Sequence, residues 1–589
     1  MGIPVGSDDY VRATVQSLAS DGAVQSYDIT AQLPDLQCRS LAARLSAGLA
    51  RFQHVLRVVN PAHTTQACRS IDHAARRALG NLLRYPGYLP DHVWAQATLP
   101  LRFGGYGARS ALEVANAAFL GGWTASQQGR WPLQKLLPDL ASAINDPDGS
   151  FLHRHPQIIA LRAAWSRCLS SSPYLTLLAR AAAAGVLPSV ERTDTHREQL
   201  WRRHVLLGIP IPPNGASPAT IDATMLSRIN SATSNFTHSQ LSRVDRPADY
   251  LFTAHMLSAA GCPKLQRLIS RADARTHFTK FWASLQHPEV PSRVRLRFRS
   301  VLNNLSSTPL RVLPSTPHTT FTDPQFLWYL NDRLLLPQPA VDRLRGKPCN
   351  CNPQTGQVTI ADGHHLRVCQ KGGGVRFVHN RLRDRIRDVC AAAGLVARTE
   401  VPGLLPGTLE RPGDVVAYNW PHPNFDRCAI DVTITDTASA IRLRGQRRLR
   451  ETQTGIHAVA RETAKANHRP GGTQQPPLTQ RLRHRGVHFV PLAFEVGGAT
   501  GKSWSPFIKK LSEIAHERRG YPPSSFRIYW TNQVAVTLAK TGAQAALFKL
   551  HRLRTRRLPE PPAPVPALDF LALAAPDPDD LGSSSAHRS

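Results

Sequence analysis

Two aspartates, Asp414 and Asp431, stand in neighbouring runs of sequence that read as strands. Asp414 opens DVVAY, and Asp431 lies inside CAIDVTI. In the second run apolar and polar residues alternate, which places Ile430, Val432 and Ile434 on one face and Asp431 on the other. Two explanations fit two acids in this setting. Either the strands have one wet, polar face, or the carboxylates hold a divalent metal ion.

A second group of residues with metal chemistry lies between residues 345 and 375. The stretch CNCNPQTGQVTIADGHHLRVC contains three cysteines and two histidines, which are Cys349, Cys351, His364, His365 and Cys369. Two thiolates at one end, and a histidine shortly before a third thiolate, are typical of a tetrahedral Cys₃His zinc site. The first pair is spaced C-x-C, where C-x-x-C is commoner, and the spacing does not choose between the histidines. The alternative is a loop with solvated Cys and His side chains.

The next stretch, VRFVHNRLRDRIRDVCAAAG, predicts an amphipathic helix. Its apolar stripe consists of Val378, Leu382, Ile386 and Val389. The rest of its surface carries Arg381, Arg383, Arg385 and Arg387, with two acids, Asp384 and Asp388, placed to pair with some of them. This is either a solvated, salt-bridged face or a track for backbone phosphates.

The whole chain is strongly basic. It has 589 residues, and 72 Lys and Arg against 41 Asp and Glu give a net charge of +31. Because such an excess destabilises a compact fold by self-repulsion, a polyanionic partner is its natural explanation. The alternative is a GC-rich genome that inflates Arg, Ala and Pro. The nine scattered cysteines do not form a disulfide framework and favour a reducing compartment.

Membrane insertion and secretion are not expected from this sequence. No apolar run approaches the roughly 18 residues that a membrane span requires. The opening MGIPVGSDDYVRATVQ lacks a basic segment followed by an apolar one, so we expect no signal peptide and no membrane partner.

Five regions are predicted from pattern and composition, with a mixed fold overall. We expect a helical region at 1–130, a helical linker region at 131–344 and the Cys/His segment at 345–375. We then expect an α/β domain at 376–550, and a basic, then disordered, Pro/Ala/Ser-rich tail at 551–589. In the first region, LQCRSLAARLSAGLARFQHVLRVV predicts one core-facing stripe from Leu41 through Leu45 to Leu56. The glycines in FGGYG indicate tight packing rather than phosphate binding.

Several stretches together resemble one family, the polyproteins of non-LTR retrotransposons. GIPVGSDDYV, LPDLQCRSLAARLSAGLARFQHVLRV and QATLPLRFGGYGARSALEVANAAFLGGW are similar to the region C-terminal to the polymerase palm in these reverse transcriptases. The Cys/His segment, GGGVRFVHNRLRDRIRD, RPGDVV and AIDVTITD are similar to the C-terminal zinc knuckle and restriction-like endonuclease of the PD-(D/E)xK class. The resemblance covers most of residues 1 to 550, and the pieces stand in the family's order.

The polymerase palm itself is missing from this sequence. A palm binds its two metals with adjacent aspartates on a hairpin, and the only such pairs here are Asp8-Asp9 and Asp579-Asp580. The first pair lies in post-palm sequence and the second in the loose tail. We therefore expect no copying by this chain alone, and interpret it as a 5′-truncated or split product that acts with a full-length polymerase.

The resemblance implies a nuclease site that holds Mg²⁺ through Asp414 and Asp431, with Glu400 as a third acid. Two departures weaken the match: Gly413 separates the motif's Pro from its Asp, and Thr433 stands where a Lys is usual. In relatives the Lys can come from the following helix, where HAVARETAKANH supplies Lys465. The alternative for this lysine is an ordinary exposed pair with Glu462, three residues earlier.

The resemblance also implies contacts to nucleic acid and a cellular role. The residues expected to make these contacts are Arg376, His379, Asn380, Arg383, Arg447 and Arg448. The function expected is nicking of DNA for target-primed insertion, with retroelement RNA as a second partner and the nucleus as the place of action. The alternative is a DNA- or RNA-binding remnant without catalysis.

Overall fold

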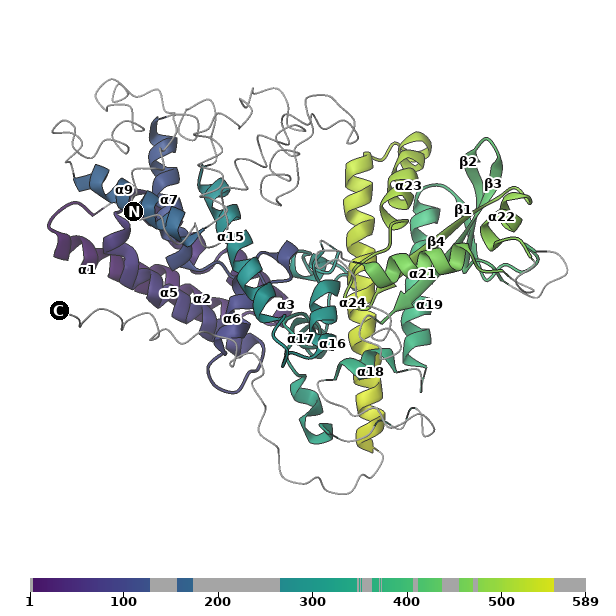
Figure 1. Ribbon diagram of the computed structural model, residues 1–589, viewed down its shortest axis with the longest axis horizontal. Coiled ribbons are helices and arrows are strands. Elements are labelled where there is room, and N and C mark those ends of the chain that lie inside the picture. The colour runs from purple at the N-terminus through teal and green to yellow at the C-terminus, as the bar shows by residue number, and fades with distance from the viewer. Residues whose placement is uncertain are drawn as a thin grey trace, which may run out of the picture. The chain divides into compact units, whose positions relative to one another are not determined.

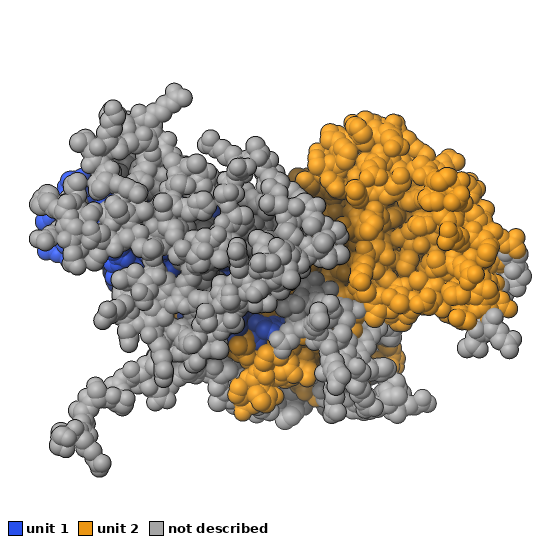
Figure 2. All heavy atoms as spheres, turned by 45° about the horizontal axis from the view of Figure 1, so that its top comes forward, with its two compact units in different colours: residues 1–31, 43–78, 109–282 blue, residues 32–42, 79–108, 283–589 orange. Residues whose placement is uncertain are grey.

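The computed structural model describes residues 4–127, 156–172, 265–303, 305–346, 349, 351, 363–369, 371, 373–405, 411–436, 455–469 and 475–555. The chain divides into two compact units, each assembled from separate stretches (Figures 1 and 2). Unit 1 contains residues 1–31, 43–78 and 109–282, and unit 2 contains residues 32–42, 79–108 and 283–589. Every candidate site residue that the structure describes belongs to unit 2.

The regular elements described in unit 1 are all helices. Its elements are α1 (Asp8–Leu18), the π-helix η1 (Ala19–Val24), α2 (Gln25–Ala31), α4 (Leu49–Val58), α5 (Pro61–Leu82, whose last turn is counted in unit 2), α7 (Ala111–Gln127), α9 (Pro156–Ser171) and α15 (Leu265–Ser284). Phe52, Val55 and Leu56 of α4 are buried in its core together with Ile71 of α5 and Ala118 of α7. Helical periodicity therefore identified the buried face of α4 correctly.

The predicted stripe from Leu41 to Leu56 is not one helix. The chain forms α3 (Leu36–Leu45) and α4, and Leu45 is 65% exposed. The break lies at Gly48, whose φ of 55° is a left-handed conformation that favours glycine. A Cβ at this position would lie 2.1 Å from the hydroxyl of Tyr27 in α2, so only glycine fits where α2 approaches the backbone.

The glycine-rich turn in FGGYG is a close-packing feature, as predicted. A Cβ on Gly105 would lie 1.9 Å from the carbonyl oxygen of Leu99, which leaves room only for glycine. Its carbonyl oxygen accepts a hydrogen bond of 3.1 Å from the buried guanidinium of Arg333. Through these contacts the turn packs against Leu99 and binds Arg333 of α17 within unit 2.

Unit 2 contains further helices and a four-stranded mixed sheet. The helices and 3₁₀ turns before the sheet are α3, α6 (Asp91–Thr98), η2 (Leu101–Phe103), α16 (Ser292–Ser300), η6 (Thr308–Leu310), α17 (Asp323–Arg333), η7 (Pro339–Leu344), α18 (His364–Val368) and α19 (Gly374–Ala392). The strands are β1 (Val396–Thr399), β2 (Val415–His422), β3 (Phe425–Thr435) and β4 (Val487–Glu495), and the remaining helices are α21 (Ile456–Ala466), α22 (Leu478–Arg483), α23 (Trp504–Arg519) and α24 (Pro523–Thr555).

The sheet has the order β1-β2-β3-β4. The first two pairings are antiparallel, and β3 pairs with β4 in parallel. Because parallel neighbours need a crossover, the chain between β3 and β4 contains α21 and α22. The strands expected around Asp414, around Asp431 and in VHFVPLAFEV are therefore present.

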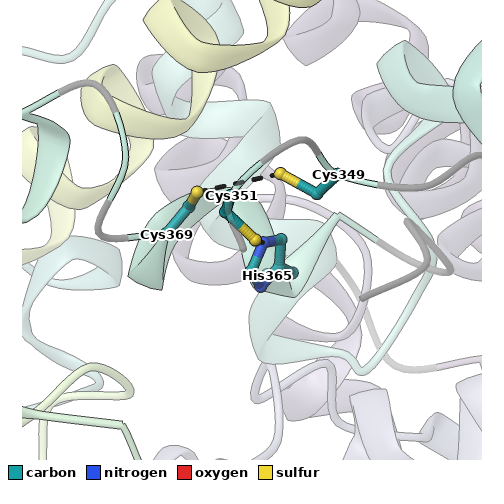
Figure 3. A group of neighbouring side chains, drawn as sticks. All are labelled: Cys349, Cys351, His365 and Cys369. Atoms are coloured by element: carbon teal, nitrogen blue, oxygen red, sulfur yellow. Dashed lines mark hydrogen bonds between the residues drawn. The ribbon is translucent and has the colours of Figure 1, made fainter. Parts of the chain in front are cut away.

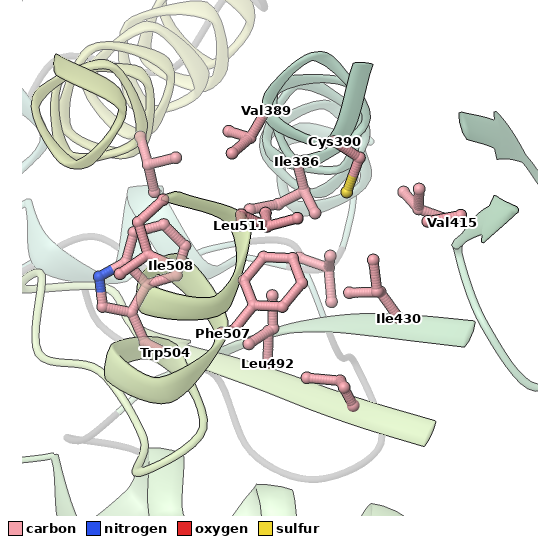
Figure 4. Packing of buried hydrophobic residues seen from close by; sticks show 14 of the residues in the cluster. Ile386, Val389, Cys390, Val415, Ile430, Leu492, Trp504, Phe507, Ile508 and Leu511 are labelled. Atoms are coloured by element: carbon pink, nitrogen blue, oxygen red, sulfur yellow. The ribbon is translucent and has the colours of Figure 1, made fainter. Parts of the chain in front are cut away.

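Both faces of the sheet carry apolar side chains. On one face, Ile430 and Leu492 share a buried cluster with Ile386 of α19, Leu511 of α23 and Leu538 of α24 (Figure 4). The stripe predicted for α19 is wholly buried in this cluster, since Val378 is 4% exposed and Leu382, Ile386 and Val389 are fully buried. The second face packs a smaller cluster, which comprises Leu404, Leu405, Val416, Ala429, Leu478, Leu482, Val487 and Phe489.

Helix α24 extends five residues beyond the predicted domain boundary at residue 550, and residues 556–589 lie outside the described part of the chain. Among the described helices, none is both long and apolar enough to cross a membrane.

Candidate metal centre and acidic site

The structure brings three cysteines and one histidine into a single cluster (Figure 3). The ligand atoms of Cys349, Cys351, His365 and Cys369 all lie within 4.8 Å of one another. The Sγ atoms of Cys349 and Cys369 are 3.8 Å apart, and Cys351 Sγ is 3.3 Å from His365 Nε2. A tetrahedron with the usual Zn–S and Zn–N bond lengths has edges of roughly 3.6 to 3.8 Å, so this cluster could hold a metal such as zinc.

The contact between Cys349 and Cys369 couples the ionisation of their thiols. The hydrogen bond from Cys349 lowers the pKa of the Cys369 thiol well below its usual range, and His365 adds to this effect. Cys349 is buried and its pKa is raised by the same contact. Because a thiolate is the form that binds metal, a bound ion would displace the proton that these two thiols share. The C-x-C spacing is accommodated, since Cys349 and Cys351 both belong to the cluster.

His364 points elsewhere, which answers the question that the spacing left open. Its Nε2 lies 3.0 Å from Asp436 Oδ1, and its Nδ1 lies 3.6 Å from Asp332 Oδ1. The neighbouring histidines of α18 therefore have different partners. His365 joins the cluster, and His364 joins α18 to α17 and to the end of β3.

The surroundings of His364 form a buried network of charges. The Asp332 carboxylate binds Arg297 at 3.0 Å and also binds Arg367, whose guanidinium donates to the carbonyl oxygen of Val496 at 2.8 Å. Burial alone would raise the pKa of Asp332, but Arg367 and Arg297 hold it well below its usual range. The network was not predicted, because its members are far apart in sequence and carry no local motif.

Asp431 is the centre of the acidic site, which we define as Asp414, Asp431 and Lys465. Its Oδ1 accepts a bond of 3.0 Å from the Lys465 ammonium, and its Oδ2 accepts one of 3.1 Å from the Thr433 hydroxyl. Asp431 is only 8% exposed. Burial raises the pKa of this carboxyl, the Lys465 charge opposes the shift, and the Asp414 charge adds to it.

Asp414 lies one residue before β2 and opposite Asp431. The register pairs Val415 with Ile430, so its continuation pairs Asp414 with Asp431. Asp414 Oδ2 accepts a bond of 2.7 Å from the Val432 amide and lies 3.3 Å from His379 Nε2. Its Oδ1 has no hydrogen bond to any residue that the structure describes.

His379 connects helix α19 to both strands. Its Nε2 also lies 2.9 Å from the carbonyl oxygen of Val432. The hydrogen bond to Asp414 raises the pKa of His379 above its usual value, against the opposing effect of burial. Its Nδ1 lies 3.3 Å from the Asn380 side chain. The imidazole thus holds the Asp414 carboxylate in place beside Asp431.

Gly413, which splits the expected Pro-Asp pair, has a packing reason. A Cβ at this position would lie 3.1 Å both from the Ala429 Cβ and from the Ile430 amide nitrogen. That spacing is tighter than most real contacts, so glycine allows the chain entering β2 to lie close against β3.

Glu400, the expected third acid, is occupied by arginines. Its carboxylate binds Arg383 at 2.9 Å and Arg411 at 3.4 Å. Its backbone is unusual, with a φ of 53°, and its amide donates to the carbonyl oxygen of Asp414 at 3.0 Å. Glu400 therefore neighbours the acidic site through its backbone, while its side chain neutralises arginines.

Glu462 does not pair with Lys465, so that alternative is wrong. Glu462 is 6% exposed and accepts bonds from the amides of Ala493 and Ser503, at 3.3 Å and 3.2 Å. Lys465 instead binds Asp431. A related role belongs to Glu495, which accepts a bond of 3.1 Å from the His457 amide at the start of α21. These two buried acids hold α21 in place through backbone amides.

The residues expected to contact nucleic acid fall into three groups. Arg376 is exposed on α19, whereas Arg383 is partly buried in ion pairs with Asp384 and Glu400. His379 and Asn380 lie beside the acidic site. Arg447 and Arg448 lie outside the described residues. The predicted pairing of Asp388 with arginines is also present, at 3.4 Å from Arg385 and 2.8 Å from Arg387.

No protein-family model matches this chain, and no curated protein matches it. The resemblance to retrotransposon polyproteins therefore rests on the sequence stretches themselves.

Proposed function

We propose that the chain is a metal-dependent DNA endonuclease of retroelement origin that nicks one strand. The observation that carries this proposal is the bond of 3.0 Å between Lys465 and Asp431, with Asp414 opposite in the sheet register. Two acids on adjacent strands and a lysine from the following helix are the three residues that the resemblance implies for a PD-(D/E)xK site. Lys465 reaches this position although it is 34 residues from Asp431.

The two carboxylates suit Mg²⁺ by their chemistry. Burial is the main cause of the raised pKa of Asp431, and the Asp414 charge adds to it, so a divalent cation between the two carboxylates would offset both effects. Bound there, Mg²⁺ would polarise a phosphate and lower the pKa of a water molecule. Asp414 Oδ1 and the oxygens of Asp431 would hold the ion, and His379 would keep Asp414 oriented.

Lys465 has a separate role in this proposal. Its side chain is 41% exposed, so its ammonium can turn from Asp431 toward a phosphate or an attacking water while remaining within the site. A positive charge there stabilises the developing negative charge of phosphate cleavage. Thr433 keeps one oxygen of Asp431 hydrogen-bonded, in the place where relatives carry the lysine.

The biological setting derives from the same proposal. Nicked DNA would provide the primer for target-primed insertion, with retroelement RNA and a full-length polymerase as partners in the nucleus. The net charge of +31 favours such polyanionic partners, and the Cys/His cluster would hold Zn²⁺ as a structural metal.

Nicking of supercoiled plasmid by the full chain, with and without Mg²⁺, tests the activity. We expect Mg²⁺-dependent open circles, and Asp431→Asn should reduce the rate by at least about a hundredfold because it removes a metal-binding charge. The matched control is Asp426→Asn on the same strand, since Asp426 is 71% exposed and pairs only with Arg427 in the described structure. Equal rates for Asp431→Asn and the parent protein would refute a role for this site.

A second candidate is a nucleic-acid-binding protein without catalysis. Two observations favour it: Thr433 replaces the usual lysine, and one oxygen of Asp414 is already bound by His379 and the Val432 amide. This candidate predicts strong, salt-sensitive binding of DNA or RNA and no nicking at any Mg²⁺ concentration.

A further inference from the structure

An exposed aromatic surface lies where helices α19 and α24 pack together. The Phe548 ring of α24 is 54% exposed, and its centroid lies 6.2 Å from that of Phe377 on α19, in an edge-on arrangement. The Arg381 guanidinium lies 5.5 Å above the Phe377 ring. Arg376 and Lys371 are exposed nearby in sequence. We call Lys371, Arg376, Phe377, Arg381 and Phe548 the Phe548 surface.

Acidic residues are absent from the sequence that builds this surface. Residues 363–383, which include α18 and the first half of α19, contain no Asp or Glu, and neither do the 33 residues of α24. Over the same stretches the basic residues are numerous. Arg367 and Arg383 pair with acids outside these stretches. Arg376 and Arg381 are exposed and have no acidic partner in the described structure, so the surface suits an anionic partner.

The exposure of Phe548 is not required by the core. The buried contacts of α24 with α19 are made by other residues, among them Leu538 and Ala545. A half-exposed aromatic side chain beside arginines suits single-stranded nucleic acid. Unpaired bases stack on the ring, and the phosphates bind the cations.

We infer that the Phe548 surface binds single-stranded nucleic acid, with an unpaired base stacked on Phe548. A duplex is a poorer ligand, because its base faces are already covered by neighbouring bases. Arg376 and Arg381 would contact the phosphates on either side of the stacked base. DNA and RNA offer the same base faces and phosphates, so the inference covers both.

Helical geometry relates this surface to the acidic site. Arg376 and His379 are three residues apart on α19 and therefore neighbours on its surface, and His379 contacts Asp414. The Phe548 surface thus continues along α19 toward the carboxylates. Its role in cleavage, to hold an unpaired strand beside the nicking site, rests on the proposed function. The binding of single strands by this surface does not depend on the proposed function.

The test is fluorescence anisotropy with labelled 20-mers, namely oligo(dT), oligo(U) and a mixed-sequence duplex, without added Mg²⁺. We expect Phe548→Ala in the full chain to weaken binding of the single strands about five- to hundredfold, and binding of the duplex less than twofold. The matched control is Tyr529→Ala, because Tyr529 is an aromatic residue of the same helix with the same 54% exposure. Its affinities should equal those of the parent.

Further variants separate stacking from charge and from folding. Phe548→Trp should retain single-strand binding, and Arg381→Ala should weaken it and make its salt dependence shallower by about one unit of log–log slope. Zinc content and thermal unfolding of Phe548→Ala should match those of the parent, since the residue is exposed. A Phe548→Ala protein that binds single strands as tightly as the parent, or weakens duplex binding equally, overturns the inference.

Two results distinguish this inference from the proposed function. A chain that never nicks but loses single-strand affinity in Phe548→Ala supports the surface and refutes the nuclease. A change in sedimentation of Phe548→Ala, with unchanged affinity, would instead identify the surface as a contact between copies of the chain and overturn the inference. A loss confined to oligo(dT) or to oligo(U) supports it and identifies the nucleic acid.

Discussion

At the scale of single residues, the acidic site depends on how one buried charge is compensated. Asp431 is 8% exposed, and its carboxylate is balanced by Lys465 on one oxygen and by the Thr433 hydroxyl on the other. A neutral hydroxyl compensates a buried charge far less than an ammonium does. The ammonium of Lys465 on α21 is therefore the main electrostatic compensation of the Asp431 carboxylate.

Lys465→Ala should slow nicking about ten- to a hundredfold, less than loss of Asp431, because a positioning charge is easier to lose than a metal ligand. Thr433→Lys returns an ammonium to the same carboxylate and should recover part of the lost rate in the double variant. Single-turnover nicking at saturating Mg²⁺ measures both changes. A Lys465→Ala rate equal to that of the parent would show that the lysine is only an ion-pair partner of Asp431.

The two histidines of α18 should respond differently to the same substitution. We expect the full chain to bind about one zinc, His365→Asn to lose it, and His364→Asn to retain it. His364→Asn should nevertheless unfold more easily, by about 1–3 kcal/mol, because Asp332 and Asp436 lose their shared partner. Metal analysis measures the zinc content of each variant, and urea unfolding measures its free energy of unfolding. Equal zinc loss in both variants would contradict the assignment.

At the scale of elements, buried and half-buried carboxylates position helices in both units. In unit 2, Glu495 accepts from the start of α21, which carries Lys465. In unit 1, Asp72 of α5 accepts from the Ser110 hydroxyl and from the Ala111 amide, both at 2.6 Å, where α7 begins. Such acceptors satisfy amides that a helix end leaves without an intrahelical partner.

The Asp72 cap should make the stability of α7 depend on pH. Burial raises the pKa of Asp72 to about 6, although its hydrogen bonds act in the opposite direction. Because the folded pKa exceeds the unfolded value, the extra stability is present below about pH 4 and is lost as pH rises through about 6, at most on the order of 3 kcal/mol.

Amide hydrogen exchange of α7 measures this effect, after correction for the intrinsic rate. Protection in the parent should fall between about pH 4 and pH 7 relative to Asp72→Asn, whose amide does not titrate. Because Asp72→Asn keeps every other titrating group, its pH profile contains their contributions and corrects for them. Parallel pH profiles of the two proteins would rule out the half-buried Asp72 as the cause.

At the scale of the whole molecule, the dominant property is charge. The excess of 31 positive charges is spread over a chain with two compact units, and many arginines in unit 2 are paired with acids, as Arg383 and Arg387 are. Each arginine that forms an ion pair with an acidic side chain is less able to bind a phosphate of a nucleic acid. The residues that remain exposed without an acidic partner in the described structure, such as Arg376 and Arg381, are the ones expected to bind.

Binding of the full chain to DNA should therefore be strongly salt-dependent. If about six phosphates are neutralised, the log–log slope of affinity against salt concentration is about −5. Titrations of a labelled duplex between about 50 and 300 mM KCl measure the slope. Affinity that does not change with salt would contradict both candidate functions.

The sequence by itself determined the features that depend on local periodicity. The stripe of α19, the apolar face of β3 and the presence of β4 follow from side chains two to four residues apart. The structure buries the α19 stripe together with Ile430 and Val432, and it also buries Asp431 on the opposite face of β3. The grouping of Cys349 and Cys369 in a cluster that could hold a metal was likewise predicted from their types and spacing. These signals are carried by neighbours along the chain, so they need no knowledge of the fold.

Only the tertiary structure decided which residues share a site. His364 and His365 are equivalent by spacing. His364 contacts Asp332 of α17 and Asp436, the residue after β3, and this leaves His365 for the Cys/His cluster. Lys465 meets Asp431 because the crossover from β3 to β4 returns α21 to the sheet. The helix break at Gly48 depends on Tyr27, which lies outside any local pattern. Such contacts arise from packing between distant segments, and a one-dimensional pattern does not encode which segments meet.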